Sequence, residues 1–373
     1  YGMINGVQGL LEEKYVELDK EIQTNLDIEL LKRTPSAYLG SCRFKLPNME
    51  EYEQIYEKIF SILDKIGVDK FFYIGGNDSM DTIKKLHTYG TAKNKKVQFI
   101  GVPKTIDNDL AITDHTPGFG SACKYIATTV KEIIKDATVY DAKNITIIEI
   151  MGRNAGWLTA AAGVTKSDDC DGVDLIYLPE VVFDIENFIS KVKKLQKTKK
   201  SLVIAISEGI KNKNGINICE LEEENTLLDC FGHKSLSGTA NNLARILYKN
   251  LGCKTRAIEL NTTQRCASHF MSEVDINESF LAGIYAVSVA LNGENGKVVI
   301  FERTSNSPYN INMKSHNVYD IANVEKKVPL EWIDIDNATV SNELIQYIKP
   351  LIQGEVYPII VDGLPKHLKL NKK

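Results

Sequence analysis

The chain has 373 residues, with 43% hydrophobic and 25% charged residues and a formal net charge of -4. This composition is typical of a folded protein of two or three domains and excludes disorder as a general description. The mild acidity argues against a surface built for nucleic acids or anionic membranes, and no apolar run approaches the ~18 residues that span a bilayer.

Short apolar strands alternate with amphipathic helices along the chain. A strand at residues 70–74 precedes a helix that extends to about Tyr89, and further elements follow it in the same alternation. The remaining predicted strands cover residues 97–102, 145–150, 173–178, 202–206, 256–260 and 297–301, and the remaining helices cover residues 120–136, 185–196, 237–250 and 277–292. This order predicts an α/β fold in which helices cover both faces of parallel sheets.

Polar segments follow five of the predicted strands. They are residues 75–79, 103–109, 151–156, 207–209 and 261–265. Ligands of open parallel sheets bind at the carboxyl ends of the strands, so the five segments predict a single site. The charged segments at residues 325–327 and 370–373 are expected to be exposed and peripheral. The seven scattered cysteines form no C-x-x-C pair, which predicts reduced, cytosolic thiols and no structural zinc.

The first polar segment is Gly75-Gly76-Asn77-Asp78-Ser79, placed between a strand and a helix. Its glycines permit close approach of the backbone to a ligand, and a helix N-terminus favours an anion. An ordinary strand-to-helix connection is the alternative, and this motif alone does not decide between them.

The second polar segment reads PKTIDND and carries Lys104, Thr105, Asp107 and Asp109. The two carboxylates stand two residues apart, so in an extended loop one can face a substrate hydroxyl and the other a metal. A hydrogen-bonded turn without chemistry is the alternative. The density of charge beside a strand end favours a reactive site.

Several later residues have two possible roles. Arg153 offers a planar guanidinium that suits phosphate, or it forms a structural ion pair, and Arg256 and Arg265 share that ambiguity. Glu208 could accept hydrogen bonds from sugar hydroxyls or close a loop. The sequence has no P-loop, no G-x-G-x-x-G, no H-E-x-x-H and no G-x-S-x-G motif, and its histidines show no metal-ligand spacing.

The ordered motifs GGNDS, PKTIDND, MGR, SEG and Arg256…Gln264-Arg265 closely resemble the phosphofructokinase family from Tyr1 to about Arg265. Residues 39–44 (LGSCRF) resemble the LGS-x-R segment of that family. Residues 1–18 resemble the region after the family's first strand, Gly-rich loop and helix. Because the chain also begins Tyr-Gly-Met, we expect N-terminal residues to be missing.

The resemblance implies two Rossmann-like three-layer α/β/α domains with mostly parallel sheets and the active site in the cleft between them. The phosphoryl-donor domain would comprise residues 1–118 with about 264–318. The sugar-phosphate domain would comprise residues 119–263 with about 319–373. The resemblance further implies a cytoplasmic homodimer or homotetramer that binds no nucleic acid and no membrane.

Two positions indicate the phosphoryl donor. ATP-using members of the family have glycine where this chain has Asp78 and Lys104, whereas the pyrophosphate-using members resemble this sequence. Asp78 would repel the α-phosphate of ATP, and Lys104 supplies a compact cation for a terminal phosphate. The resemblance therefore implies pyrophosphate as donor. An ATP-dependent kinase of the same fold and a non-catalytic regulatory subunit are the alternatives.

The implied reaction transfers a phosphoryl group reversibly from pyrophosphate to the 1-hydroxyl of fructose 6-phosphate in glycolysis, giving fructose 1,6-bisphosphate and phosphate. Asp107 would be the general base, Thr105 would position the hydroxyl, and Arg153 with Lys104 would stabilise the phosphoryl group. The remaining implied roles are substrate binding by Asp109, Met151, Gly152, Glu208, Arg265 and a neighbouring subunit's copy of Arg256; donor binding by Gly75, Gly76, Asn77, Asp78, Ser79 and Arg43; and Mg²⁺ binding by Asn77, Asp78 and Asp109. Asn77 stands where many members have a metal-binding aspartate.

Overall fold

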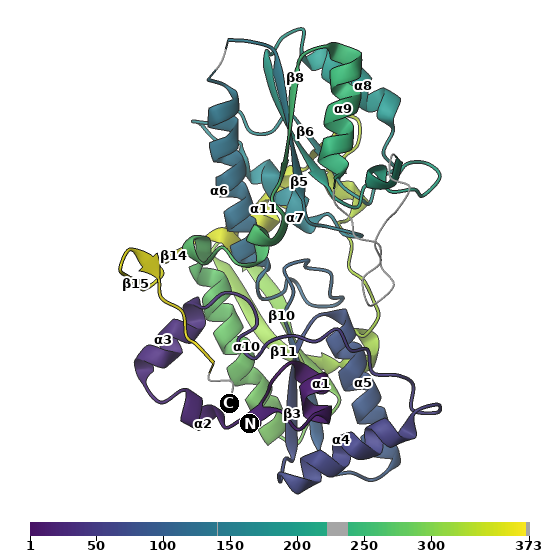
Figure 1. Ribbon diagram of the computed structural model, residues 1–373, viewed down its shortest axis with the longest axis vertical. Coiled ribbons are helices and arrows are strands. Elements are labelled where there is room, and N and C mark those ends of the chain that lie inside the picture. The colour runs from purple at the N-terminus through teal and green to yellow at the C-terminus, as the bar shows by residue number, and fades with distance from the viewer. Residues whose placement is uncertain (140, 222–237, 371–373) are drawn as a thin grey trace.

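The chain forms two stacked α/β units, each built on a four-stranded sheet (Figure 1). The structure is a computed structural model that describes residues 1–139, 141–221 and 238–370. In the view of Figure 1 the lower unit holds the first sheet, in the order β11-β10-β4-β3, and both chain termini lie beside it. The upper unit holds the second sheet, in the order β6-β7-β5-β8.

The elements have the following bounds. The sheet strands are β3 (Lys70–Gly75), β4 (Gln98–Pro103), β5 (Asn144–Ile150), β6 (Leu175–Tyr177), β7 (Ser201–Ser207), β8 (Lys254–Glu259), β10 (Lys297–Asn306) and β11 (Tyr309–Asn317). Two-residue strands occur at β1 (Gly2–Met3), β2 (Tyr15–Val16), β9 (Met271–Ser272), β12 (Ile333–Asp334), β13 (Thr339–Val340), β14 (Glu355–Val356), β15 (Ile360–Val361) and β16 (Leu364–Pro365). The helices are α1 (Gly6–Leu11), α2 (Leu18–Glu21), α3 (Asn25–Arg33), α4 (Glu53–Lys65), α5 (Asn77–Ala92), α6 (Phe119–Ala137), α7 (Trp157–Ala160), α8 (Ile185–Leu195), α9 (Thr239–Leu251), α10 (Glu273–Leu291) and α11 (Asn342–Ile348).

Helices cover both faces of the first sheet because its strands are apolar on both sides. Ile100 and Val102 of β4 pack with Ala286 and other residues of α10. Phe99, which points to the opposite face, packs with Met80 of α5 and with residues of α4. Strands β3, β4 and β10 are parallel.

The second sheet is entirely parallel and has the same three-layer construction. Ile148 and Ile150 of β5 face α6, α7 and α11. Ile145 and Ile147 of the same strand face α8 and α9. The predicted α/β/α architecture is therefore confirmed.

The predicted strands and helices are present, with bounds that differ by a few residues. Helices α1 to α4, α7 and α11 and the two-residue strands were not predicted, and neither was strand β11 of the first sheet. It pairs with β10 in antiparallel register at the edge of the first sheet. Its sequence, YNINMKSHN, is polar at alternate positions, and none of its residues is fully buried. The strand lacked the continuous apolar run used to find the others because only one edge and one face of it are covered.

Helix α10 is long and apolar enough to cross a bilayer by length and composition, and it is the only such helix in the described ranges. One such helix is weak evidence for a membrane protein, because the covering helix of a sheet passes the same test. Here Ala282, Ala286 and Val289 pack on β4 and β10. Six of the seven cysteines lie in the described ranges, and all six are free thiols.

The expectation that residues 325–327 are peripheral is correct for Glu325 and Lys327, which are exposed, but wrong for Lys326. The Lys326 backbone N–H donates to the carbonyl of Asp109 at 2.7 Å, and its ammonium group donates to the carbonyl of Asp114 at 2.7 Å. The charged composition of residues 325–327 predicted exposure for all three residues. Burial of a single cation among them leaves no periodic signal in the sequence.

Candidate active site

The two polar segments of the first unit lie side by side because β3 and β4 are neighbouring parallel strands. Gly75 pairs with Pro103 at the carboxyl ends of these strands, and the Lys104 N–H donates to the Gly75 carbonyl at 3.0 Å. Helix α5 begins at Asn77, and no side chain caps its N-terminus. The predicted donor-binding segment at residues 75–79 is thus next to the loop that connects β4 with α6.

This connection, residues 104–118, is called the Asp107 loop below. The Asp107 backbone N–H donates to Thr105 Oγ1 at 3.1 Å, and Thr105 Oγ1 donates to Asp107 Oδ2 at the same distance. Asp107 is accessible to solvent, yet desolvation raises the pKa of its carboxyl group, against the opposing effects of Thr105 and nearby cations. A carboxylate of raised pKa that can be reached from solvent is suited to accept a proton.

Asp109 lies beside Asn77, whose Nδ2 donates to Asp109 Oδ2 at 3.2 Å. Burial and the charge of Asp107 raise the pKa of Asp109 to about 6. The oxygen of the same amide, Asn77 Oδ1, is buried and has no hydrogen-bond partner. An orphaned amide oxygen beside a carboxylate is a donor set that fits Mg²⁺, which takes few protein ligands and retains water and phosphate ligands.

The rest of the implied metal set is less complete. Asp78 is exposed in the first turn of α5. The described ranges contain no group of three or more His, Cys, Asp or Glu residues placed to hold a metal. Protein ligation of Mg²⁺ would therefore rest on Asn77 and Asp109, with substrate oxygens and water completing the shell.

The three polar segments of the second unit meet at the ends of β5, β7 and β8. The Glu208 N–H donates to the Ile150 carbonyl at 3.0 Å, and Glu208 Oε1 accepts from the Gly152 N–H at 3.4 Å. Gly152 has φ 146°, and a Cβ atom there would lie 2.7 Å from Ser207 Oγ. The glycine of the MGR motif is therefore required by the close approach of two strand ends.

Side chains from both units act on the same carboxylates. Among the groups that lower the pKa of Asp107 are Lys104 after β4, Arg153 after β5 and Arg265 in the turn after β8. Burial raises the pKa of Glu208 to about 7, and Asp107 adds to this shift while Arg153 and Arg265 oppose it. These interactions bring the carboxyl ends of the two sheets to one candidate site.

Two of the predicted site arginines, Arg256 and Arg43, lie on the exposed surface. Arg256 is exposed on β8, and its guanidinium pairs with Asp136 of α6 at 3.2 Å. Arg43 is exposed in the loop between α3 and α4.

Buried Gln264 was missed as a site residue although its neighbour was chosen. Gln264 Oε1 accepts from the Met151 N–H at 3.1 Å and so fixes the start of the MGR segment. The only sequence signal was its position directly before Arg265.

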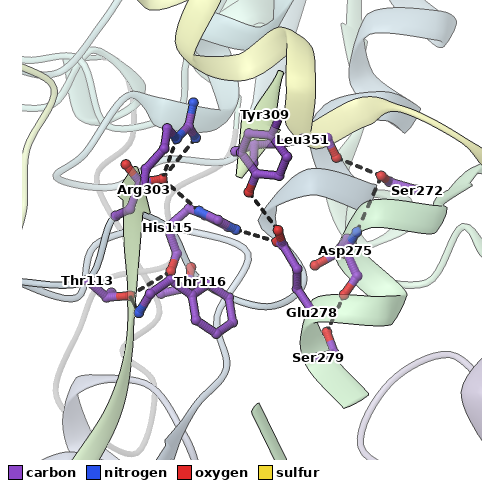
Figure 2. Close-up of polar contacts among 12 residues, drawn as sticks. Thr113, His115, Thr116, Ser272, Asp275, Glu278, Ser279, Arg303, Tyr309 and Leu351 are labelled. Atoms are coloured by element: carbon purple, nitrogen blue, oxygen red, sulfur yellow. Dashed lines mark hydrogen bonds and ion pairs between the residues drawn. The ribbon is translucent and has the colours of Figure 1, made fainter. Parts of the chain in front are cut away.

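A buried ionic network anchors the Asp107 loop to α10 and β10 (Figure 2). His115 is 2% exposed, and its ring nitrogens lie 2.7 Å from Asp114 Oδ2 and 2.6 Å from Glu278 Oε2. Arg303 pairs with the same Asp114 carboxylate at 2.8 Å, and the hydroxyl of Tyr309 donates to Glu278 at 2.6 Å. Both ring nitrogens face a carboxylate, which favours the doubly protonated imidazolium. The network gives His115 a structural role in holding the loop.

We expect His115→Gln to lower the free energy of unfolding by about 3–5 kcal/mol, because it leaves the buried Glu278 carboxylate without its cation and Asp114 with Arg303 alone. Burial alone lowers the pKa of His115, but the hydrogen bonds to Asp114 and Glu278 outweigh it and raise the pKa above 6.5. The stabilisation is therefore complete below about pH 6.5 and disappears as the pH rises through the folded-state pKa. Urea denaturation at pH 6 and pH 9 should show the larger deficit at pH 6.

His316→Gln is the matched control, because His316 pairs with Asp320 at 3.1 Å on the exposed surface. This variant should unfold within about 0.5 kcal/mol of the wild type. An equal deficit for His115→Gln at both pH values would contradict an imidazolium between the two carboxylates.

Comparison with known proteins gives one consistent family. The family model described as phosphofructokinase matches residues 1–290. Pyrophosphate–fructose 6-phosphate 1-phosphotransferase of Methylococcus capsulatus is 36% identical over 372 residues, which cover 99% of this chain and 87% of the relative. The enzyme of the same name from Xanthomonas campestris pv. campestris is 38% identical over 370 residues, covering 98% of this chain and 87% of the relative.

The solved structures agree with the sequence comparison. A pyrophosphate-dependent phosphofructokinase from Nitrosospira multiformis superposes with a TM-score of 0.88 and is 32% identical. The superposition covers 100% of this chain and 87% of that structure. The similarity therefore includes both sheets and all the loops of the site described above.

Proposed function

This chain belongs to the phosphofructokinase family, and on that premise we propose that it transfers a phosphoryl group from pyrophosphate to the 1-hydroxyl of fructose 6-phosphate. The observation that carries the proposal is the position of Asp107 among cations from both units: Lys104, Arg153 and Arg265. A base surrounded by cations suits a reaction between two anionic substrates. The reaction is reversible, because the donor and the product ester are both phosphate compounds of modest transfer potential.

Asp107 accepts the proton of the 1-hydroxyl as that oxygen attacks the nearer phosphorus atom of pyrophosphate. The bond from this phosphorus to the bridging oxygen breaks, and inorganic phosphate leaves with the bridging oxygen. Thr105, hydrogen-bonded to the Asp107 carboxylate, holds that carboxylate in place and contacts the attacking hydroxyl. Arg153 and Lys104 stabilise the negative charge that spreads over the phosphoryl oxygens in the transition state. Such electrostatic stabilisation by positioned groups provides most of the rate enhancement in phosphoryl transfer. Mg²⁺, when bound at Asn77 and Asp109, supplies charge neutralisation to the phosphate oxygens.

The sugar phosphate occupies the ends of β5, β7 and β8. Glu208 accepts hydrogen bonds from sugar hydroxyls, and Arg265 pairs with the 6-phosphate. Met151 and Gly152 contribute backbone groups to the sugar-phosphate site at the same strand ends. Arg256 is exposed, which suits contact with the substrate of a second copy in a homodimer or homotetramer.

The donor follows from Asp78 and Lys104. Both side chains are exposed and stand at the two neighbouring strand ends of the first unit. A carboxylate at position 78 repels a nucleotide's additional phosphate, whereas pyrophosphate has none to place there. The relatives named above carry pyrophosphate in their names, which supports the same donor.

Turnover of fructose 6-phosphate by the purified full-length protein with each donor tests the proposal. We expect Mg²⁺-dependent formation of fructose 1,6-bisphosphate with pyrophosphate, and kcat/KM at least about 100-fold lower with ATP, corresponding to about 2.7 kcal/mol of discrimination. The reverse reaction with phosphate should also proceed. Turnover with ATP and none with pyrophosphate would instead identify an ATP-dependent kinase.

We also propose that the two units correspond to a donor domain (residues 1–118 with about 264–318) and a sugar-phosphate domain (residues 119–263 with about 319–373). The return of β10 to the first sheet, parallel to β4, supports a donor domain assembled from two chain segments. The packing of Leu344 and Ile348 of α11 with β5 supports the return of the chain to the second unit.

A further inference from the structure

The ammonium group of Lys326 lies inside the Asp107 loop and contacts residues at both ends of it. An ammonium has three N–H donors, and three acceptors of the loop surround this one. Nζ donates to Asn108 Oδ1 at 3.2 Å, to the Thr113 carbonyl at 3.1 Å and to the Asp114 carbonyl at 2.7 Å. One side chain therefore ties the reactive end of the loop, near Asp107, to its far end.

The Lys326 backbone holds the same loop from outside. Its N–H donates to the Asp109 carbonyl at 2.7 Å, and the neighbouring Glu325 forms a β-bridge with Leu110. The Lys326 carbonyl accepts from Trp157 Nε1 at 3.0 Å, and the ammonium lies 5.2 Å from the centroid of the Trp157 ring. Trp157 belongs to α7 of the second unit, so Lys326 links the loop of one unit to the core of the other.

Asn108, which accepts a hydrogen bond from Lys326, lies between Asp107 and Asp109 in the chain. Asn108 is fully buried and has φ 54°, a left-handed conformation in which its neighbours Asp107 and Asp109 project differently from those of an extended strand. Its Oδ1 accepts from Lys326, and its Nδ2 donates to Tyr347 Oη at 2.9 Å. With both ends of the amide bound, the peptide units on either side of Asn108 have little freedom to rotate.

Burial of the Lys326 ammonium group costs desolvation free energy. Burial lowers the pKa of Lys326 to about 7, although the nearby carboxylates of Asp114 and Asp109 oppose that shift. A buried cation is weak evidence for stability, because apolar replacements of similar volume often serve stability equally well. The three loop acceptors therefore point to a role in fixing the loop.

We propose that Lys326 is a positioning residue that holds the Asp107 loop in the geometry needed for proton abstraction. The proposal rests on the proposed function, since it takes Asp107 as the base of that reaction. Lys326 itself touches no reacting atom. It acts through Asn108 and the backbone of Asp109.

Kinetics of Lys326→Met with fructose 6-phosphate and pyrophosphate tests this role. Displacement of a reacting group by ~1 Å costs up to about 100-fold, so we expect kcat to fall by about 30- to 100-fold, with the KM of each substrate within threefold of the wild type. Lys326→Gln, which retains two N–H donors without the charge, should give a kcat between those of Lys326→Met and the wild type. Amide hydrogen exchange at residues 105–118 should be faster in Lys326→Met.

Lys327→Met is the matched control, because this exposed neighbour loses the same charge from the same segment. Wild-type activity with pyrophosphate is measured first, so that its absence is assigned to the proposed function and not to the role of Lys326. If Lys326→Met does not fold, a kcat of Lys326→Gln at least threefold below that of Lys327→Met supports the role. A kcat within twofold of Lys327→Met for every folded Lys326 variant, or a loss confined to KM, overturns it.

Discussion

Replacement of Asp107 by Asn is expected to lower kcat by about 1,000-fold, within the 10²–10⁴-fold range of general base catalysis. The amide has the shape of the carboxylate and can still accept the hydrogen bond that Thr105 donates to Oδ2. It cannot take a proton at neutral pH. The KM values of both substrates should change little, since loss of the base affects the transition state more than the bound substrates. Steady-state assay of purified protein measures the effect.

Asp64→Asn is the control for this substitution, because it makes the same chemical change on an exposed carboxylate of α4. It should retain wild-type kcat. A kcat for Asp107→Asn above one tenth of the wild type would remove Asp107 from the role of base. Equal and negligible turnover of the wild type with either donor would favour the non-catalytic subunit.

The double variant Asp78→Gly with Lys104→Gly is expected to lose at least about 100-fold in kcat/KM for pyrophosphate, the effect of removing a strong stabilising group from a developing anion. The same variant should gain activity with ATP. Two like charges about 4 Å apart cost about 1 kcal/mol in water and about 4 kcal/mol at an effective dielectric of 20, so removal of the Asp78 carboxylate relieves a barrier of that order. Parallel titrations with the two donors measure both changes.

The control for the donor experiment is Asp64→Asn with Lys95→Gln, which removes an exposed ion pair of 3.2 Å and leaves the net charge unchanged, as the test variant does. Its ratio of pyrophosphate to ATP activity should equal that of the wild type. Unchanged pyrophosphate kinetics in the Asp78/Lys104 variant would show that these positions do not select the donor.

The parts of the fold that have a local or periodic signal were predictable. Buried parallel strands such as β5 (Asn144–Ile150) are continuous apolar runs, and the polar segments after them mark the carboxyl edge of a sheet. Strand β11 was not predicted, because an edge strand with one covered face is polar at alternate positions and forms no continuous apolar run. Its partner β10 was found because it lies inside the sheet.

The sequence by itself determined the α/β class and the family, and it predicted which segments carry the chemistry, because each of these depends on short motifs of neighbouring residues. Only the tertiary structure decided how those segments act on one another. The cations Arg153 and Arg265 reach Asp107 across more than forty residues of chain, and Lys326 inserts into a loop more than two hundred residues earlier. A single lysine that satisfies three distant acceptors leaves no pattern in its own neighbourhood, since the energy that selects it depends on where the loop backbone lies after folding.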